Sequence, residues 1–321
     1  MKICLVGPGI MQIPPKGWGA VEILIWDYYN TLKEVKTEVT IINKIRNSPI
    51  DQNNPNTKHC KELINEINNG NYNFVHIHYD CLYHIIPYIQ CKKIGFTSHY
   101  PYIDKIEMHR KDGFTNIFNF MVNNDKFYHF VLAQKDIEFL TVNGAKKENL
   151  FKLENGVDIN KFKFINEPLN GNKTIYLGKI SSRKGQHKYN SLNNLDIIGP
   201  GGNNLNNWKG EWTREEVYLN LSQYGNLLLL SSGEADPLVV KEALICGLGV
   251  VVNQTSSKNL EANDFIHIIE DEDMNNLDLI QKIIDNNKEQ SLKIRKKIKK
   301  YGEEKFGWNN LIEHYLNVLN I

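Results

Sequence analysis

Two glutamates, Glu234 and Glu242, lie eight positions apart between two strongly apolar segments. Residues 227–230 are four leucines and residues 250–252 are three valines. Such short apolar runs are typical of parallel strands that are buried on both faces. Open α/β sheets bind ligands beyond the carboxyl ends of their strands. The sequence therefore predicts a carboxylate, Glu234, at the ligand-binding edge of a parallel sheet.

The segment between the two strands is predicted to be a helix. Asp236 is suited to the N-cap, Pro237 to the first helical position, and Gly247 to the residue that ends the helix. Glu242 then lies inside this helix, two turns beyond Glu234. Carboxylates at this spacing also occur on solvated helix faces, and the flanking buried strands favour a binding site instead.

This strand–helix–strand segment resembles the paired-glutamate motif of retaining glycosyltransferases with the GT-B fold, especially glycosyltransferase family 4 (glycosyl transferases group 1). The resemblance implies an α/β protein in which two Rossmann-like, doubly wound parallel-sheet domains face a central cleft. It implies transfer of a hexose-like sugar from a nucleoside-diphosphate sugar, UDP- or GDP-linked, to a hydroxyl acceptor such as a glycan or glycolipid. By resemblance, Glu234 contacts the transferred sugar and Glu242 holds the ribose. No metal or other cofactor is expected.

The resemblance extends from Pro14 to Tyr315 and is most specific in 155–162, 176–185 and 231–252. The segment 155–162 begins with Asn-Gly-Val-Asp, and the resemblance gives it a structural role at the junction of the domains.

The chain departs from the family pattern directly after Glu234. The family commonly has Pro-Phe-Gly-Leu there, whereas this chain has Ala-Asp-Pro-Leu. Pro237 has no N–H to offer a diphosphate, although Leu238 keeps one. An Asp236 carboxylate at the helix N-cap would compete with the diphosphate for the same donors. This departure motivates an alternative function, a GT-B protein that binds sugar nucleotides with little or no transfer activity.

Two lysines, Lys179 and Lys184, lie in a loop beyond a predicted strand at 174–178. They resemble the family's Gly-Arg…Lys-Gly segment, whose cations bind the diphosphate. Lysine at 179 supplies charge without the bidentate geometry of arginine. Departure of a nucleoside diphosphate develops negative charge, which fixed cations stabilise. A solvated basic turn is the alternative interpretation.

Two glycines, Gly17 and Gly19, precede the first predicted helix, which extends to about residue 33. The family has a glycine-rich loop at this point, where the backbone approaches phosphate closely, and a plain tight turn is the alternative. Gly7-Pro-Gly9 suggests instead a dinucleotide fingerprint and an NAD-dependent oxidoreductase. Gln12 occupies the place of the third glycine of that fingerprint, so this second alternative is weaker.

Histidines follow two strands of the first half. His99 ends the predicted strand 95–99 and resembles the family histidine that hydrogen-bonds the transferred sugar. His76 and His78 share a strand face, as metal ligands can. Their segment echoes a metallo-β-lactamase motif, but Cys81 replaces its last histidine and the family interpretation of that strand requires no metal.

Composition excludes several classes of protein. The apolar fraction of 41% suffices for two hydrophobic cores, and a net charge of +1 gives no field that favours nucleic acid. Five scattered cysteines without a Cys-x-x-Cys pair suggest a reducing cytoplasm. No apolar run reaches the roughly 18 residues of a membrane span. The basic run 293–300 is interpreted as a solvated helix face, with peripheral contact to anionic lipid as the alternative.

Strands and helices alternate through both halves of the chain, which favours parallel doubly wound sheets. We expect an N-terminal acceptor-side domain at 1–165, a C-terminal donor-side domain at 166–302, and a final helix within 303–321 that returns to the first domain. The polar stretch 163–173 is the expected linker. A single long helix is expected at 277–301.

Overall fold

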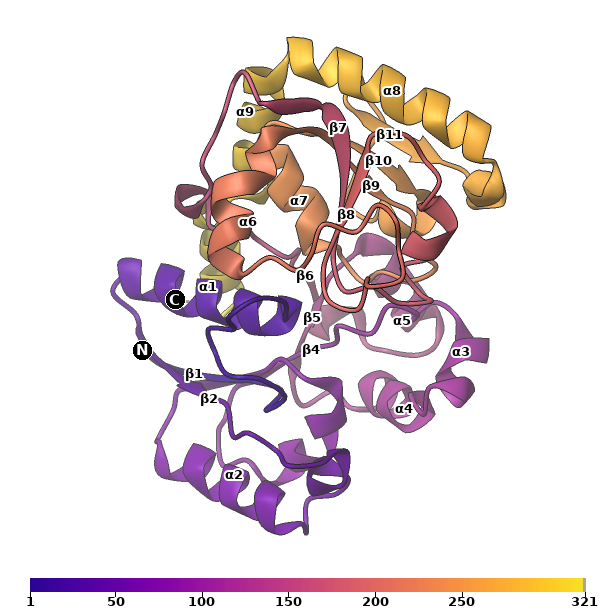
Figure 1. The fold of residues 1–321 in the computed structure, drawn as a ribbon. Helices are drawn as coiled ribbons and strands as arrows, with labels where there is room; N and C mark the ends of the chain where they lie inside the picture. Colours follow the sequence, from indigo (N-terminus) through magenta and orange to yellow (C-terminus); the bar gives the residue numbers. More distant parts are fainter. Residues whose placement is uncertain (320–321) are drawn as a thin grey trace. The chain divides into compact units, whose positions relative to one another are not determined.

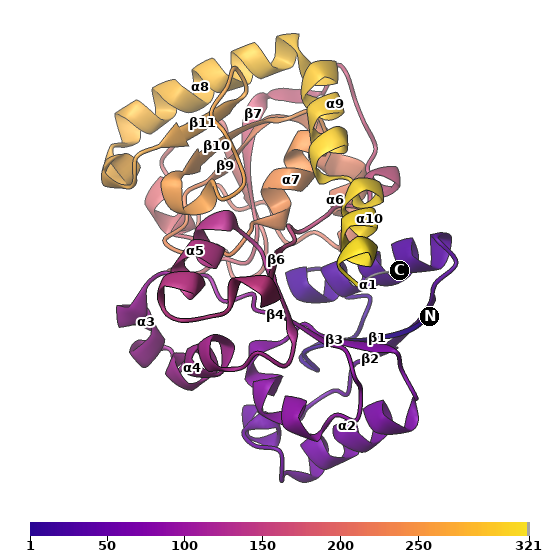
Figure 2. The ribbon, with the colours of Figure 1, turned by 180° about the vertical axis from the view of Figure 1, so that it is seen from behind.

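The computed structural model describes residues 1–319 of the 321-residue chain. It divides into two compact units, shown as ribbons in Figures 1 and 2. The first comprises Met1–Pro15, Gly19–Glu154 and Leu311–Ile321, and the second comprises Lys16–Trp18 and Asn155–Asn310. The chain thus changes unit between Glu154 and Asn155, so the position between 165 and 166 expected for the boundary lies inside the second unit.

The first unit contains a six-stranded parallel sheet with the order β2-β1-β3-β4-β5-β6. Its strands are β1 (Lys2–Val6), β2 (Glu38–Ile42), β3 (Phe74–Ile77), β4 (Ile94–Thr97), β5 (Tyr128–Val131) and β6 (Leu150–Lys152). The order reverses between β1 and β3, which makes that position the switch point of the sheet. The strand expected at 95–99 corresponds to β4, which ends at Thr97, two residues before His99.

Alternation along β3 shows how the first sheet is covered on both faces. Val75 and Ile77 point into a core on one face, whereas Phe74 and His76 contact Tyr315 on the other. The helices of this unit are α1 (Ala20–Glu34), α2 (Lys58–Asn69), α3 (Ile106–Lys111), α4 (Thr115–Asn123), α5 (Gln134–Val142) and the end of α10 (Trp308–Val318). Both sheet faces are therefore buried, as expected for a doubly wound fold.

The second unit contains a five-stranded parallel sheet with the order β11-β10-β9-β7-β8. Its strands are β7 (Asn170–Leu177), β8 (Leu195–Ile198), β9 (Tyr224–Leu229), β10 (Gly249–Asn253) and β11 (Ile266–Ile269). From β7 the chain continues outward to β8, and it then returns to the other side of β7 with β9. The switch point of this sheet therefore lies between β7 and β9.

Helices cover this sheet on two sides, with α8 along one face and α7, backed by α9, on the other (Figures 1 and 2). The helices are α6 (Arg214–Asn220), α7 (Leu238–Ile245), α8 (Leu277–Lys293) and α9 (Arg295–Phe306). Helix α6 begins with a capping box, because the Thr213 side chain accepts from the Glu216 N–H and the Glu216 carboxylate accepts from the Thr213 N–H.

The expected single helix at 277–301 is wrong, because the chain breaks at Ile294 into α8 and α9. The break brings Arg295 into the core, where its guanidinium donates to the carbonyls of Ile165, Ser222, Tyr224 and Cys246. One of these carbonyls belongs to the stretch expected as the linker. That stretch packs on the second unit, since Lys163 N–H also donates to the carbonyl of Tyr218.

The basic run 293–300 carries little unpaired charge. Arg295 is buried, and four of its lysines form ion pairs with nearby carboxylates: Lys293 with Glu289, Lys297 with Asp264, Lys299 with Glu303, and Lys300 with Glu304. Within residues 1–319, no helix combines the length and the apolar character that crossing a bilayer requires.

Candidate functional site

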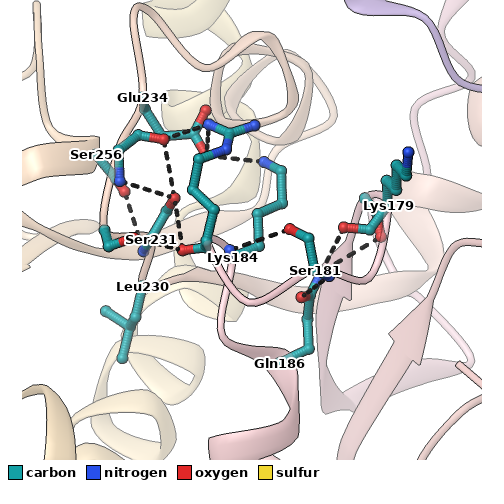
Figure 3. A network of polar contacts seen from close by, with 12 residues as sticks. Lys179, Ser181, Lys184, Gln186, Leu230, Ser231, Glu234 and Ser256 are labelled. Atoms are coloured by element: carbon teal, nitrogen blue, oxygen red, sulfur yellow. Dashed lines mark hydrogen bonds and ion pairs between the residues drawn. The ribbon is translucent and has the colours of Figure 1, made fainter. Parts of the chain in front are cut away.

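Lys184 and Glu234 meet at the switch point of the second sheet. Lys184 lies in the loop after β7 and Glu234 in the loop after β9, and the distance from Lys184 Nζ to Glu234 Oε1 is 2.9 Å. Arg183 adds a second cation, with its Nη1 3.5 Å from the same oxygen, and it also donates to the carbonyl of Gly233. Figure 3 shows Lys184 of one loop directed toward the carboxylate of Glu234 in the other.

The loop that carries the cations is held by its own polar contacts (Figure 3). Gln186 Nε2 donates to the carbonyl of Lys179, and Gln186 Oε1 accepts from the N–H of Ser181. The Tyr176 hydroxyl donates to the carbonyl of Lys184. Gly178, at φ 148°, makes the backbone turn that starts the loop, a conformation that L side chains rarely adopt. These contacts hold the backbone of the loop at Lys184 and at Lys179.

Lys179 does not join this cluster. Figure 3 shows its side chain directed away from Lys184 and Glu234. Its ammonium lies 4.7 Å from the centre of the Trp18 ring, in cation–π geometry. Trp18 belongs to the short segment Lys16–Trp18 that packs on the second unit, where the Arg214 N–H donates to the Lys16 carbonyl.

The two glycines expected to act together lie in different units. Gly17 is beside Glu211 and Trp212 of the second unit, and a Cβ at Gly17 would be 3.5 Å from atoms of both. Gly19 belongs to the first unit, where it is the N-cap of α1 at φ 129°. Gly17 therefore packs on the segment that precedes α6, whereas Gly19 begins α1 of the first unit.

Asp236 is not the N-cap of α7, and this corrects the sequence-based expectation. Pro237 is the N-cap, and no side chain caps the helix. The Asp236 Oδ2 atom accepts instead from Lys241 Nζ at 2.6 Å and from the backbone N–H of Asn155 at 2.7 Å. The ion pair with Lys241 and the distant Asn155 N–H thus take the place of a cap, and the negative charge of Asp236 is compensated.

The start of α7 is left without an internal hydrogen-bond acceptor. Leu238 is its first residue, and the Leu238 N–H donates to no acceptor among residues 1–319. A helix end with free N–H groups favours anions. The expected end of the helix is confirmed, since Gly247 follows it at φ 77°. Leu238 and Glu234 thus belong to the segment that joins β9 to α7, and Glu234 links this segment to the cations of the loop after β7.

Glu242 lies inside α7 and pairs with Arg214, the first residue of α6. The Arg214 Nη2 atom is 2.5 Å from Glu242 Oε1, and the Glu242 side chain is buried. Burial lowers the pKa of Arg214, but the Glu242 carboxylate outweighs this effect, so the pKa is raised overall. No hydrogen bond within the described chain engages Glu242 Oε2. This second oxygen is free to accept a hydroxyl hydrogen.

His99 lies in the first unit, just beyond β4. Burial lowers its pKa to about 4, so the ring is neutral near pH 7. Its Nε2 atom has no hydrogen-bond partner among residues 1–319. A neutral imidazole with a free nitrogen is suited to a hydroxyl group and unsuited to holding phosphate charge.

His76 and His78 do not form a metal site with other ligands. The nitrogens of His76 are engaged by the Tyr315 hydroxyl at 3.0 Å and the Thr97 hydroxyl at 2.8 Å. No group of three or more His, Cys, Asp or Glu side chains in the described chain is placed to hold a metal ion. Burial lowers the pKa of both rings well below the ordinary value. These histidines are neutral members of the packing around Tyr315.

Sequence reasoning missed three members of the site: Arg183, Arg214 and Lys241. Arg183 adjoins Lys184 and could have been found as a second cation of the same loop. Arg214 gave no local signal, because its partner Glu242 lies 28 positions away in the sequence. Lys241 had the clearest signal, because a lysine inside the apolar helix 238–245 requires a buried partner.

The structure is similar to several solved glycosyltransferase structures. HepE from Anabaena in complex with UDP and glucose is 14% identical, with a TM-score of 0.72 over 100% of this chain and 99% of HepE. Sucrose-phosphate synthase from Thermosynechococcus elongatus is 13% identical, with a TM-score of 0.73 over 99% of this chain and 98% of that chain. The lipopolysaccharide outer core galactosyltransferase WaaB is 14% identical, with a TM-score of 0.67 over 99% of each chain.

Identities this low establish the fold alone. With its two parallel-sheet α/β units, the chain has the GT-B fold, as expected from the sequence. Sequence comparison adds no further match, since no model of a protein family and no curated protein sequence matches the chain.

Proposed function

We propose that the protein is a retaining glycosyltransferase that moves a hexose-like sugar from a nucleoside-diphosphate sugar to a hydroxyl acceptor, a glycan or glycolipid. The observation that carries the proposal is the cluster of Lys184, Arg183 and Glu234 at the switch point of the second sheet. It joins cations for a diphosphate to a carboxylate for sugar hydroxyls. The uncapped start of α7 follows within a few residues of it.

The donor's diphosphate is assigned to Lys184, Arg183 and the Leu238 N–H. Negative charge grows on this group as its bond to the sugar breaks, and fixed donors stabilise that charge without reorganising. Lys179 contributes only when its ammonium leaves the Trp18 ring. The two cations of the cluster and the backbone donor make a divalent metal unnecessary for holding the diphosphate.

The sugar and ribose are assigned to the two glutamates. Glu234 offers Oε2 to the hydroxyls of the transferred sugar, since its Oε1 is held by the cations. Glu242 offers Oε2 to the ribose, since its Oε1 is held by Arg214. The role of His99 in hydrogen bonding the transferred sugar stays a prediction from the sequence, and its neutral ring at pH 7 is suited to a hydroxyl group. Retention follows in this proposal from attack on the face that the leaving group departs from, with no covalent enzyme intermediate.

The solved structures support a nucleotide-sugar donor. HepE has been solved with UDP and glucose and with UDP-glucose, and its fold is shared over the whole chain. We accordingly place UDP-sugars first among the donors to be tested and GDP-sugars second.

The two alternative functions have less support than the transferase. The binding protein without transfer activity was suggested by Asp236 and Pro237; Lys241 compensates the Asp236 charge, whereas Pro237 still offers no N–H. The oxidoreductase was suggested by Gly7-Pro-Gly9, but a dinucleotide fingerprint must open a helix and α1 begins only at Ala20.

A panel of UDP- and GDP-sugars tests the proposal. At least one of them should raise the melting temperature, be hydrolysed slowly, and release sugar with retained anomeric configuration, as followed by proton NMR. Glu234→Gln should slow hydrolysis at least tenfold, about 1.4 kcal/mol, with UDP affinity nearly unchanged. Glu289→Gln, at an exposed ion pair of α8, is the matched control. Inverted product, or absence of any thermal shift across the panel, would refute the proposal.

A further inference from the structure

The pair of Asp236 and Lys241 at the start of α7 has no role in the proposed chemistry, yet both side chains are buried. Lys241 is 1% exposed and Asp236 is 4% exposed. Lys241 Nζ donates to Asp236 Oδ2 at 2.6 Å and to the carbonyl of Asn155 at 2.8 Å. The Asn155 side-chain amide closes the ring of contacts by donating to the Asp236 carbonyl at 2.7 Å. A buried ion pair costs desolvation, so its retention needs a reason.

The Asp236 carboxylate has a second place to go. Aspartate side chains readily accept from the backbone N–H two residues further on, which here is the N–H of Leu238. That donor has no acceptor within the described chain. Asp236 Oδ1 is itself buried without a hydrogen-bond partner. Turning the carboxylate toward α7 would therefore satisfy two orphaned groups at once.

The alternative position is incompatible with an anion at α7. A carboxylate bonded to the Leu238 N–H would occupy the donor assigned to the diphosphate, and its charge would repel the ligand. Lys241 and the Asn155 N–H hold the Asp236 carboxylate away from the Leu238 N–H. The ion pair thus determines whether the start of α7 binds the Asp236 carboxylate or the diphosphate of a ligand.

We propose that Lys241 is a positioning residue that keeps Asp236 from capping α7, and so keeps that helix end able to bind the donor's diphosphate. The inference rests on the proposed function, because it takes the diphosphate as the ligand of α7. Lys241 touches no substrate in this account. Its proposed effect on diphosphate binding is exerted through Asp236, and this dependence gives the inference its test.

Binding of UDP, inorganic pyrophosphate and uridine is measured by isothermal titration calorimetry on the full chain and three variants: Lys241→Met, Asp236→Ala, which removes every side-chain acceptor at this position, and both together. Lys241→Met should weaken UDP and pyrophosphate about tenfold and leave uridine unchanged, since only the phosphates compete with the freed carboxylate. Asp236→Ala should bind UDP within about twofold of the wild type. The double variant should recover the affinity that Lys241→Met loses, because no carboxylate remains to cap the helix.

A pair that only supports the fold behaves differently. Both single variants would then weaken UDP to a similar extent, or the double variant would be as weak as Lys241→Met, and either result overturns the inference. Lys241→Gln keeps a donor without the charge, and it replaces Lys241→Met if that variant does not fold, with the same direction expected. If the wild type binds pyrophosphate and UDP but transfers no sugar, the proposed function is refuted and the inference about Lys241 is not. If the wild type binds neither ligand, the proposed function and the inference about Lys241 are both refuted.

Discussion

Replacing Lys184 by methionine removes the cation that approaches Glu234 most closely. Methionine keeps most of the apolar stem of the side chain, which is largely buried, and removes only the ammonium 2.9 Å from Glu234 Oε1. Arg183 remains 3.5 Å from the same oxygen, so Glu234 is not left without a cation. The change therefore removes one charged contact without leaving an isolated buried carboxylate.

The expected loss follows from the chemistry of a charged hydrogen bond. One such contact to a diphosphate contributes about 1.5–3 kcal/mol, which is roughly a 10- to 150-fold change in the dissociation constant. The lower end is the better expectation, because Arg183 can partly take over the phosphate contact. We expect UDP to bind Lys184→Met about 10- to 30-fold more weakly than the wild type, with uridine affinity unchanged.

Isothermal titration calorimetry with UDP and uridine measures this loss, and Lys188→Met is its matched control. Lys188 follows in the same stretch of chain, is exposed, and contacts Asn275 at 3.4 Å instead of Glu234. UDP binding within twofold of the wild type in Lys184→Met would refute the assignment of the diphosphate to this cluster. An equal loss in Lys188→Met would show that general surface charge, and not the cluster, attracts the ligand.

Two further predictions concern stability. Glu242→Gln leaves the Arg214 guanidinium without its carboxylate, and the free energy of unfolding should fall by about 3–5 kcal/mol in urea denaturation; a loss below 1 kcal/mol would show that the pair is not coupled. His129 is buried with both ring nitrogens unpartnered in the described chain, and burial lowers its pKa to about 3. The unfolded chain takes up this proton first as pH falls below about 6.5, so stability is lost from there toward pH 3. His129→Leu should raise stability at pH 7 by about 1–3 kcal/mol and flatten this pH dependence, and an unchanged slope would contradict the assignment.

The sheets were the most predictable part of the chain. Strands such as β9 and β10 are buried along their whole length, so their apolar runs are visible in the sequence. The strand β11 is an edge strand with an exposed and a half-buried residue in its middle, and it has no such run. The break at Ile294 was also hidden, because it is stabilised by carbonyls distant in sequence that bind Arg295.

The candidate site was predictable where position along a strand decides it. Lys184 and Glu234 each follow a strand next to the switch point, and this is why residues 50 positions apart meet. Lys179 follows the same strand as Lys184, but its ammonium lies over the ring of Trp18, a residue near the start of the sequence, and not beside Glu234. Local pattern locates a loop at a sheet edge, whereas the direction of each side chain depends on distant contacts.

Asp236 shows how two departures from a motif can explain each other. Considered alone, an aspartate before a proline and a helix predicts a cap, and a cap predicts a damaged anion site. Lys241, five positions later, is equally out of place in an apolar helix. Because a buried lysine and a buried aspartate are each costly and together compensated, the two changes form one feature. The ion pair leaves the start of α7 uncapped, so the altered motif keeps the anion-binding end that its sequence suggested it had lost.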